Sequence, residues 1–433
     1  MNEQRNTEGL LSGYRVLDLT DEKGLLCGKV LGDLGADVIK VERPGGDPAR
    51  DTGPFYKDIP HPEKSLFWFF TNLNKRGITL DIETPDGRDI FRRLVKSANF
   101  VIESYEPGYM ARLGLSYPEL EVINPALIMT SITPYGQSGP YAHYKATDIT
   151  LMAAGGLMRC FGDPDRAPVR ISQPQAFFHA SLHGVIGSLV AHHWRQSTGE
   201  GQQVDVSCQE AVALSLANFT ESWDLLRYNY RREGPATVFA RPAPLGPLAR
   251  QNIYACKDGF VSAFIQGGAQ AGHVASSEAL TEWANSLGYA LELKGYDWTK
   301  LDYGTVPQAE LSRVQDIFQT FLLTMTKAEI MEESVEKSIL MMPANDAKGV
   351  MESPQFKARG FFTQVAHPEL ASLSSVEDGQ AITYPGLPVQ VSGLPYRVQR
   401  RAPLIGEHNE EVYIGELGLS REELARLKAN KVI

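Results

Sequence analysis

Two short apolar runs near the start of the chain decide its fold: YRVLDL at residues 14–19 and ADVIKVE at residues 36–42. The segment between them turns at Gly24 and continues with helical spacing through Leu34. Two apolar strands joined by a helix are typical of a βαβ unit, in which both strands lie parallel in one sheet. The sequence therefore predicts an α/β fold built on a parallel sheet.

Two local signals mark the starts of helices farther along the chain. Thr84 is followed by Pro85, and threonine is a favoured N-cap while proline is tolerated in the first helical turn. Ser420 and Glu423 have the spacing of a capping box. Strands are expected at residues 77–82, 99–103 and 126–131, a hairpin at 251–267, and helices at 84–95, 176–194, 206–230 and 420–428.

The composition limits the class of protein. The chain has 433 residues with 42 basic and 52 acidic side chains, which gives a formal net charge of −10. This length predicts two or three domains. The acidic balance argues against nucleic acid or an anionic membrane as the main partner, because both would repel the chain.

Neither export nor membrane insertion is indicated. The first eight residues are polar, unlike a secretory signal, and the charge-free stretch Ala176–Trp194 carries four of the nine histidines, which favours a helix buried in protein. The four cysteines, Cys27, Cys160, Cys208 and Cys256, lie far apart and have no metal-ligand spacing. We therefore expect a soluble, cytoplasmic protein with reduced thiols and no metal site.

Closely spaced prolines between Arg241 and Pro247 disfavour continued helix and suggest a domain boundary. We expect a large domain that begins with residues 1–225, a smaller domain over 240–375, and a return to the large domain over 385–433. Residues 381–401 are rich in proline and glycine and are expected to be extended.

Six motifs in consistent order resemble the family III CoA-transferases of the CaiB/BaiF type. They are LGADVIKVERPGGD (34–47), NKRGITLD (74–81), EPG (106–108), YGQSGPY (135–141), STGEGQQVDV (197–206) and PLIGEH (403–408). The resemblance extends from about residue 10 to the C-terminus.

The resemblance implies a Rossmann-like large domain, a smaller α+β domain, and ring-shaped subunits interlocked in a dimer. It also implies the transfer of coenzyme A (CoA) from an acyl-CoA to a free carboxylic acid, with the CoA thioester as substrate and no tightly bound cofactor. In such enzymes an aspartate attacks the thioester and forms a mixed anhydride, which preserves the activation of the acyl group.

The family's CoA contacts carry over to Arg43, Leu80, Tyr105, Arg112 and Lys145 of this sequence. Arginine suits phosphate groups because its planar fork binds oxygens in pairs, whereas lysine acts as a point charge. A tyrosine at position 105 could stack on adenine. The sequence departs from the family at Asp21 and Glu22, which follow the first strand where relatives often have an uncharged turn, and acids there oppose an anionic ligand.

The nucleophilic aspartate of the family is missing. Counting forward from Arg170 and back from Thr198 leads to Phe177, and a phenyl ring cannot attack a thioester. No carboxylate lies between Asp165 and Glu200. The resemblance therefore implies no catalytic residue in this chain, with Phe177 at the family's aspartate position.

Other features leave alternatives open. His179 or His183 could act as a base or nucleophile and Gln175 as a hydrogen-bond donor, or the histidines could simply pack in the helix. The family's glycine-rich loop has no clear counterpart, since residues 242–247 are proline-stiffened and the glycine-rich run at 266–272 falls later.

Taken together, these features predict a non-catalytic subunit of a heteromeric CoA-transferase that needs a paralogous partner with the aspartate. The chain resembles the (R)-benzylsuccinate CoA-transferases of anaerobic toluene degradation, which pair two family III subunits and use succinyl-CoA as donor. The aromatic run Phe67–Phe70 fits an aromatic acid or a hydrophobic core. The alternatives are a self-sufficient CoA-transferase with another nucleophile and a CoA-binding or regulatory protein without chemistry.

Overall fold

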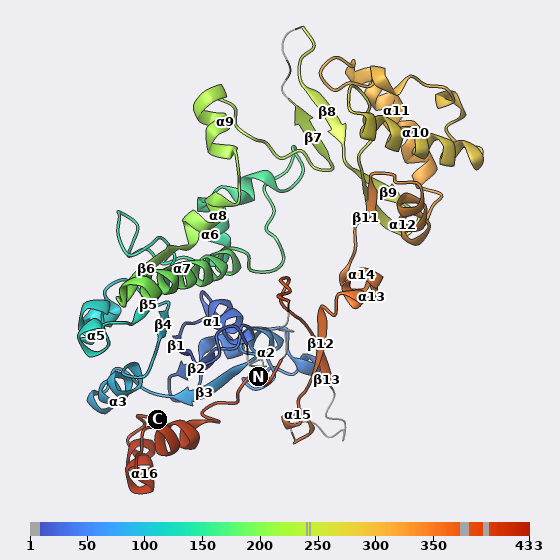
Figure 1. Ribbon diagram of the computed structural model, residues 1–433. Helices are drawn as coiled ribbons and strands as arrows, with labels where there is room; N and C mark the ends of the chain where they lie inside the picture. The colour runs from blue at the N-terminus through green and yellow to red at the C-terminus, as the bar shows by residue number, and fades with distance from the viewer. Residues whose placement is uncertain (1–8, 240, 242–243, 373–380, 393–397) are drawn as a thin grey trace, which may run out of the picture. The chain divides into compact units, whose positions relative to one another are not determined.

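A parallel sheet of six strands, in the order β3-β2-β1-β4-β5-β6, forms the centre of the first unit of the protein (Figure 1). The strands are β1 (Arg15–Leu19), β2 (Asp37–Glu42), β3 (Lys75–Thr79), β4 (Phe100–Glu103), β5 (Ile128–Thr133) and β6 (Gln202–Ser207). The chain leaves β1 toward β2 and β3, then returns to add β4 on the other side of β1. The carboxyl ends of β1 and β4 therefore meet at a switch point, where open α/β sheets bind ligands.

The computed structural model describes residues 9–433 except 240, 242–243, 373–380 and 393–397. It divides into two compact units. The first contains residues 1–158, 170–227 and 354–433, and the second contains residues 159–169 and 228–353.

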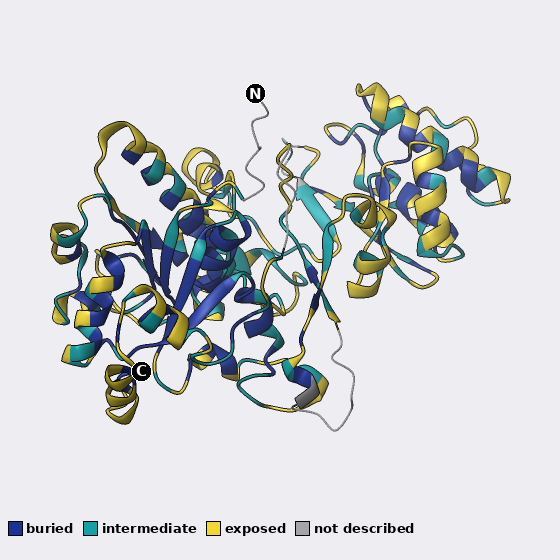
Figure 2. Ribbon diagram, turned by 60° about the horizontal axis from the view of Figure 1, so that its bottom comes forward, coloured by how far each residue is buried: buried dark blue, intermediate teal, exposed yellow. Residues whose placement is uncertain are grey.

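Successive residues of each central strand enter different hydrophobic cores on the two faces of the sheet. In β4, Val101 joins one core, while Phe100 and Ile102 join the other. Figure 2 shows these central strands as buried. One core is completed by α3 (Pro85–Val95), α5 (Tyr117–Ile123) and α16 (Arg421–Ala429), and the other by α1 (Leu25–Asp33), α6 (Asp148–Ala154), α7 (Ala176–Thr198) and α8 (Cys208–Leu214).

Most of the expected elements are confirmed. The runs at 14–19, 36–42, 99–103 and 126–131 form β1, β2, β4 and β5. The hydroxyl of Thr84 accepts the N–H of Gly87 at 3.0 Å and caps α3, and Ser420 and Glu423 form the capping box of α16. The third strand begins at Lys75 instead of residue 77, because parallel pairing with Val38 extends it toward its N-terminus.

The single helix expected over residues 206–230 is wrong. Residues up to Ser207 belong to β6, which pairs with β5, and two separate helices follow, α8 and α9 (Phe219–Leu226). Pairing with β5 overrides the helical pattern at the first two residues of this segment, and the left-handed conformation of Ala217, with a φ of +48°, lies between the two helices. The preceding helix α7 ends at Gly199, whose φ of +79° suits a residue without a Cβ atom.

The second unit has a core of its own. Strands β9 (Ile253–Cys256) and β10 (Gly259–Ala263) form the antiparallel hairpin expected at 251–267, and β11 (Met341–Pro343) pairs with β10. The unit also contains the β7–β8 pair (Ala236–Phe239 and Leu248–Gln251) and the helices α10 (Ala271–Ser286), α11 (Gln308–Leu322), α12 (Lys327–Glu336) and α13 (Ala347–Glu352). The proline-rich boundary expected at 241–247 lies partly outside the described residues.

The C-terminal part of the chain packs along the outer strand of the parallel sheet. Arg76 of β3 forms ion pairs with Asp37 of β2 and with Glu411 and Glu416 of the returning segment, at 2.5–2.8 Å. The ring of His408 accepts the N–H of Gly77 at 3.1 Å. These contacts bring the last residues of the chain beside β3.

The remaining elements of the first unit are short. They are α2 (Leu66–Thr71), α4 (Tyr109–Arg112), α14 (Pro354–Ala358), α15 (Glu369–Ser372) and the antiparallel pair β12 (Phe362–Ala366) and β13 (Ala381–Pro385). Of the extended segment expected at 381–401, only β13 is a strand, and residues 393–397 lie outside the described part. In the described part of the chain, no helix combines the length and apolar character that a membrane span requires.

Candidate functional site

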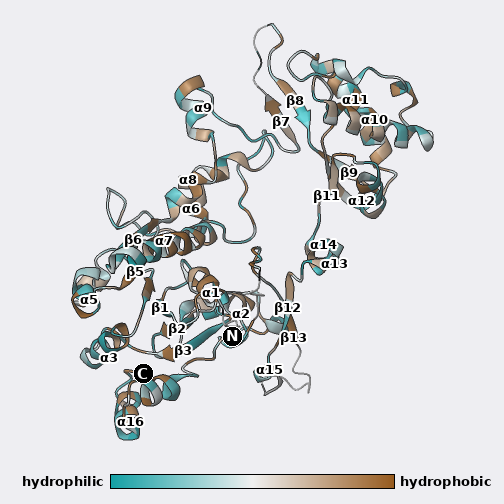
Figure 3. Cartoon of the chain, viewed as in Figure 1, coloured by the Kyte–Doolittle hydropathy of each residue, from teal (hydrophilic) through white to brown (hydrophobic). Residues whose placement is uncertain are grey.

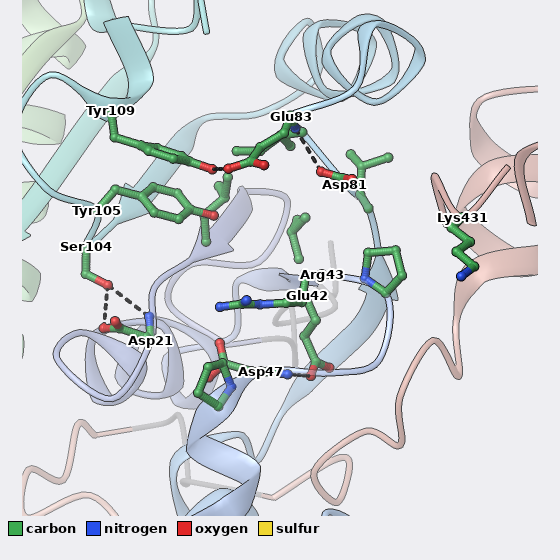
Figure 4. Close-up of a pocket in the computed structure, with 16 residues that line it drawn as sticks. Asp21, Glu42, Arg43, Asp47, Asp81, Glu83, Ser104, Tyr105, Tyr109 and Lys431 are labelled. Carbon is green, nitrogen blue, oxygen red and sulfur yellow. Dashed lines mark hydrogen bonds between the residues drawn. The ribbon is translucent and has the colours of Figure 1, made fainter. Parts of the chain in front are cut away.

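A pocket of about 600 Å³ lies at the carboxyl ends of β1, β2, β3 and β4 (Figure 4). The connections that follow these strands supply most of its wall, because all four strands end at the same edge of the sheet. Its lining includes Leu19, Asp21, Glu42, Arg43, Asp47, Leu80, Asp81, Glu83, Ser104, Tyr105, Tyr109 and Lys431. The pocket therefore occupies the switch point of the sheet.

The structure brings four of the five expected CoA-contacting residues to this region. Arg43, Leu80 and Tyr105 line the pocket. Lys145 lines a second cavity, of about 320 Å³, which shares Tyr105 with the first. Arg112 lines neither of these cavities; its guanidinium lies 5.5 Å from the ring centre of Tyr109 on the same short helix.

A stacked pair of tyrosines forms one wall of the pocket. The rings of Tyr105 and Tyr109 are 4.5 Å apart with an interplanar angle of 26°, and the Tyr109 hydroxyl donates to Glu83 at 2.8 Å. Desolvation and the adjacent Glu83 carboxylate raise the pKa of Tyr109 to about 12, so its phenol stays neutral. The sequence did not identify Tyr109, because nothing in its local pattern after Pro107 and Gly108 distinguishes it from the first residue of an ordinary helix.

Three acidic side chains of the pocket wall are paired with cations. The Glu42 carboxylate receives two hydrogen bonds of 2.7 and 2.8 Å from one buried guanidinium, and the ion pair at Asp47 is 3.1 Å long. These pairs are Asp21 with Lys23, Glu42 with Arg50, and Asp47 with Lys40. The wall therefore opposes an anion less than its acid content suggests.

The sequence predicts that Asp21 and Glu22, in the turn after β1, oppose an anionic ligand. The structure shows this unfavourable charge to be compensated at Asp21. Asp21 is paired with Lys23 and also accepts a hydrogen bond of 2.8 Å from the hydroxyl of Ser104. Glu22 is different, because desolvation and the neighbouring Asp21 raise its pKa. A raised carboxyl pKa reflects an environment that disfavours negative charge.

A buried glutamate holds the backbone of the segment that carries the two tyrosines. Glu103, at the end of β4, is 3 % exposed, and its carboxylate accepts the N–H of Tyr105 at 2.7 Å. Burial raises its pKa to about 7, although the N–H of Tyr105 and the nearby Ser131 oppose the shift. This contact fixes the start of the connection that carries both tyrosines.

The ring of Phe177 points into a hydrophobic core. Phe177 lies in the first turn of α7, is 3 % exposed, and belongs to the same buried cluster as Leu151 and Met152 of α6. In this apolar core the aromatic ring has a packing role. Position 177 therefore offers no carboxylate to a substrate.

A carboxylate nevertheless lies beside this turn in space. One carboxylate oxygen of Asp148, the first residue of α6, accepts the N–H of Ala176 at 2.8 Å. The N–H groups of Gln175 and Phe177 also favour the charged form of this carboxylate, while burial raises its pKa. Asp148 therefore caps the N-terminus of α7, a position that stabilises negative charge. The sequence gives no signal for this contact, because Asp148 lies 28 residues from Ala176 along the chain.

The other candidate groups are not assembled into a site. His179 and His183 are half-buried, and in the described part of the chain neither side chain has a hydrogen bond or lines either cavity. The amide of Gln175 reaches only the carbonyl of Gln173, at 3.5 Å. The glycine-rich run 266–272 belongs to the second unit, between β10 and α10.

The aromatic run Phe67–Phe70 belongs to the core. Trp68 is fully buried and Phe69 is 2 % exposed, and the Arg50 guanidinium stacks 3.8 Å above the Trp68 ring. The run lines neither cavity.

Comparison with known proteins agrees with this architecture. Residues 11–409 match the model of CoA-transferase family III, and the chain belongs to this family. Among its relatives is the succinyl-CoA:(R)-benzylsuccinate CoA-transferase subunit BbsE of Thauera aromatica, which is 33 % identical over 96 % of both chains. The succinyl-CoA–D-citramalate CoA-transferase of Chloroflexus aurantiacus is 31 % identical over 98 % of both chains.

A solved structure shares the fold. The crystal structure of a CaiB/BaiF family protein from Brucella suis is 27 % identical, with a TM-score of 0.77 over 94 % of this chain and 99 % of that chain. Family membership supports an enzyme of the CoA-transferase type, which acts on CoA thioesters without a tightly bound cofactor.

Proposed function

We propose that this chain is the non-catalytic subunit of a heteromeric CoA-transferase. The complex moves CoA from an acyl-CoA such as succinyl-CoA to an aromatic or other carboxylic acid such as benzylsuccinate. The observation that carries the proposal is the burial of Phe177 in the core between α6 and α7, at the position where the family resemblance expects the nucleophile. The similarity to BbsE, itself named as a subunit, supports the assembly and the choice of substrates.

The partner in this proposal is a paralogous family III chain that supplies the aspartate. Ring-shaped subunits of the two chains interlock in a cytoplasmic dimer. In each subunit of this chain, residues 1–225 and 385–433 belong to a large domain and residues 240–375 to a smaller one. The pocket at the switch point, with Arg43, Leu80 and Tyr105 in its wall, holds CoA or part of it.

An apolar stripe on α7 supports a permanent partner. Leu182, Ile186, Val190 and Trp194 recur every four residues and are between 48 % and 64 % exposed. Figure 3 shows hydrophobic residues along this helix. The opposite face of α7 packs on the sheet, so the helix has two apolar faces. A helix with two apolar faces is typical of one that is buried on both of them, here by the sheet and by a partner chain.

Reconstitution tests the proposal. The chain is purified alone and together with the paralogue from its native source, and succinyl-CoA-dependent thioester formation is measured for each chain and for the mixture. We expect activity only in the mixture, and an acyl anhydride, trapped with hydroxylamine, only on the partner. Full activity of this chain alone would falsify the proposal.

The position of Asp148 favours a second candidate, a self-sufficient CoA-transferase. Its carboxylate oxygen would attack the thioester carbonyl, break the C–S bond, release CoA thiolate and form a mixed anhydride on Asp148. Against this, the N–H of Ala176 at the start of α7 already holds this carboxylate at 2.8 Å. If the lone chain shows activity that Asp148→Asn abolishes while His179→Ala does not, this candidate replaces the first.

A third possibility, a CoA-binding or regulatory protein without chemistry, predicts a different result. The complex with the paralogue would then bind CoA but would yield no trapped anhydride on either chain.

A further inference from the structure

Lys431 is placed at the rim of the switch-point pocket by an unusual end to the last helix. After α16 ends, the N–H of Val432 donates to the carbonyl of Leu427 at 2.9 Å, and the N–H of Lys431 donates to that of Lys428 at 3.0 Å. These are the two bonds of a Schellman motif, in which the residue after the C-cap adopts a left-handed conformation. Lys431 is that residue, with a φ of +55°.

Glycine is the usual residue at this position, because a Cβ atom is strained there. In this chain the position carries a long cationic side chain instead. A strained residue that the surrounding structure holds in place is typical of functional sites.

The surroundings hold Lys431 firmly. The two residues that follow it, Val432 and Ile433, are 3 % and 8 % exposed and belong to the core below the sheet. The carbonyl of Val432 accepts the N–H of Asp81, a pocket residue, at 2.7 Å. The C-terminus is thereby tied to the connection after β3, and the Lys431 side chain is presented to the pocket.

The charges around the pocket leave this lysine available. In the described part of the chain, neither Arg43 nor Lys431 forms an ion pair, and the same holds for Asp81 and Glu83, whereas Asp21, Glu42 and Asp47 are paired with cations of their own. Figure 4 shows Arg43 between the Tyr105–Tyr109 pair on one side and Lys431 on the other. An anionic ligand that stacks on the tyrosines would therefore meet two unpaired cations.

We propose that Lys431 is a phosphate-binding residue of the CoA pocket and acts together with Arg43. The inference rests on the proposed function in so far as the ligand is CoA, and it adds a C-terminal residue that the sequence motifs do not contain. Lysine binds phosphate as a compact charge with three donors, which suits a position at the rim.

A simpler explanation is that Lys431 only complements the negative end of the α16 dipole. Arg426 and Lys428 already serve this purpose in the last turn. The two explanations differ in the CoA affinity that they predict for Lys431→Gln. A dipole partner alone predicts a lower melting temperature with unchanged affinity, whereas a phosphate-binding residue predicts a loss of affinity.

Calorimetric titration of the full chain tests the proposal, with CoA, 3′-dephospho-CoA and pantetheine as probes. We expect Lys431→Gln to weaken CoA binding about tenfold, as the loss of one charge-assisted hydrogen bond implies. Lys431→Arg should keep most of the affinity. Lys428→Gln is the matched control, since Lys428 is exposed on the same helix but does not line the pocket, and it should not change the affinity. Pantetheine, which has no phosphate, should bind each variant equally.

The probes also locate the phosphate. If Lys431→Gln weakens CoA but not dephospho-CoA, the lysine binds the 3′-phosphate; if it weakens both, it binds the pyrophosphate. Equal CoA affinity of Lys431→Gln and the unmodified chain, or no CoA binding at all, overturns the inference. Equal affinity leaves the proposed function intact, and an absence of CoA binding removes CoA from this pocket but leaves the role as a non-catalytic subunit, which reconstitution with the partner tests separately.

Discussion

The carboxylate of Asp148 accepts a hydrogen bond of 2.8 Å from the backbone N–H of Ala176, the residue directly before Phe177. The first turn of α7 thus has a carboxylate bound to its N–H groups and an aromatic side chain turned into the core. This first turn therefore packs α7 against α6 through Asp148 and Phe177, and it presents no nucleophile to a ligand. This arrangement is the physical basis of the proposed non-catalytic role.

The first prediction concerns Phe177→Asp. We expect no trapped anhydride on the variant, because the new carboxylate would lie in an apolar core and close to the Asp148 carboxylate. We also expect a loss of about 3–5 kcal/mol in the free energy of unfolding, measured with urea, from the lost ring and the buried charge. Phe177→Leu is the control, and it should lose less. An anhydride on the aspartate variant would show that the core can open toward the substrate.

The second prediction concerns the pH dependence of stability. Glu103 has a pKa of about 7 in the folded protein against an ordinary 4.5, so the folded state holds this proton more tightly than the unfolded chain. Stability should therefore decline as the pH rises from 4.5 to 7, by up to about 3 kcal/mol. Glu103→Gln keeps an acceptor for the N–H of Tyr105 and carries no charge.

Urea unfolding at pH 5 and pH 8 checks this prediction. The glutamine variant should match the unmodified protein near pH 5 and exceed its stability at pH 8. The same pH dependence in both proteins would mean that Glu103 is not the titrating group.

The third prediction separates two arginines that the family resemblance treats alike. Arg43 lines the pocket and Arg112 does not. Arg43→Gln should weaken CoA binding about tenfold in calorimetric titration, since it removes a charge that faces the ligand. Arg112→Gln should change the affinity less than about twofold, because it removes only the contact between the Arg112 guanidinium and the Tyr109 ring. The reverse order would place CoA elsewhere than in the switch-point pocket.

The fourth prediction concerns the apolar stripe of α7. Ile186 and Val190 are 55 % and 64 % exposed, and a charge on either should disrupt a hydrophobic contact with the paralogous chain. We expect Ile186→Lys to lower the yield of the complex in size-exclusion chromatography while the variant itself remains folded by circular dichroism. Val122→Lys on α5 is the control, since Val122 is 83 % exposed and lies apart from the stripe. Normal assembly of the Ile186 variant would exclude this face from the interface.

Sequence patterns predicted the strands of the large sheet and the capped helices well, because these depend on residues close together in the chain. The alternation in β1 and β4 and the capping residues Thr84 and Ser420 are local signals. The helix expected over 206–230 failed at β6, where pairing with a strand some 70 residues earlier decides the conformation. The pocket residues Arg43, Leu80 and Tyr105 followed from motifs, whereas Tyr109 and Lys431 carry no comparable signal.

By itself, the sequence determined the parallel α/β sheet, the family, and the absence of an acidic side chain at position 177, since each is a property of local order along the chain. Only the tertiary structure decided which cations neutralise the pocket wall, that Asp148 caps α7, and that the C-terminus brings Lys431 to the carboxyl ends of the strands. These are contacts between segments distant in the chain. Their strength depends on distance and burial, which a linear pattern does not contain.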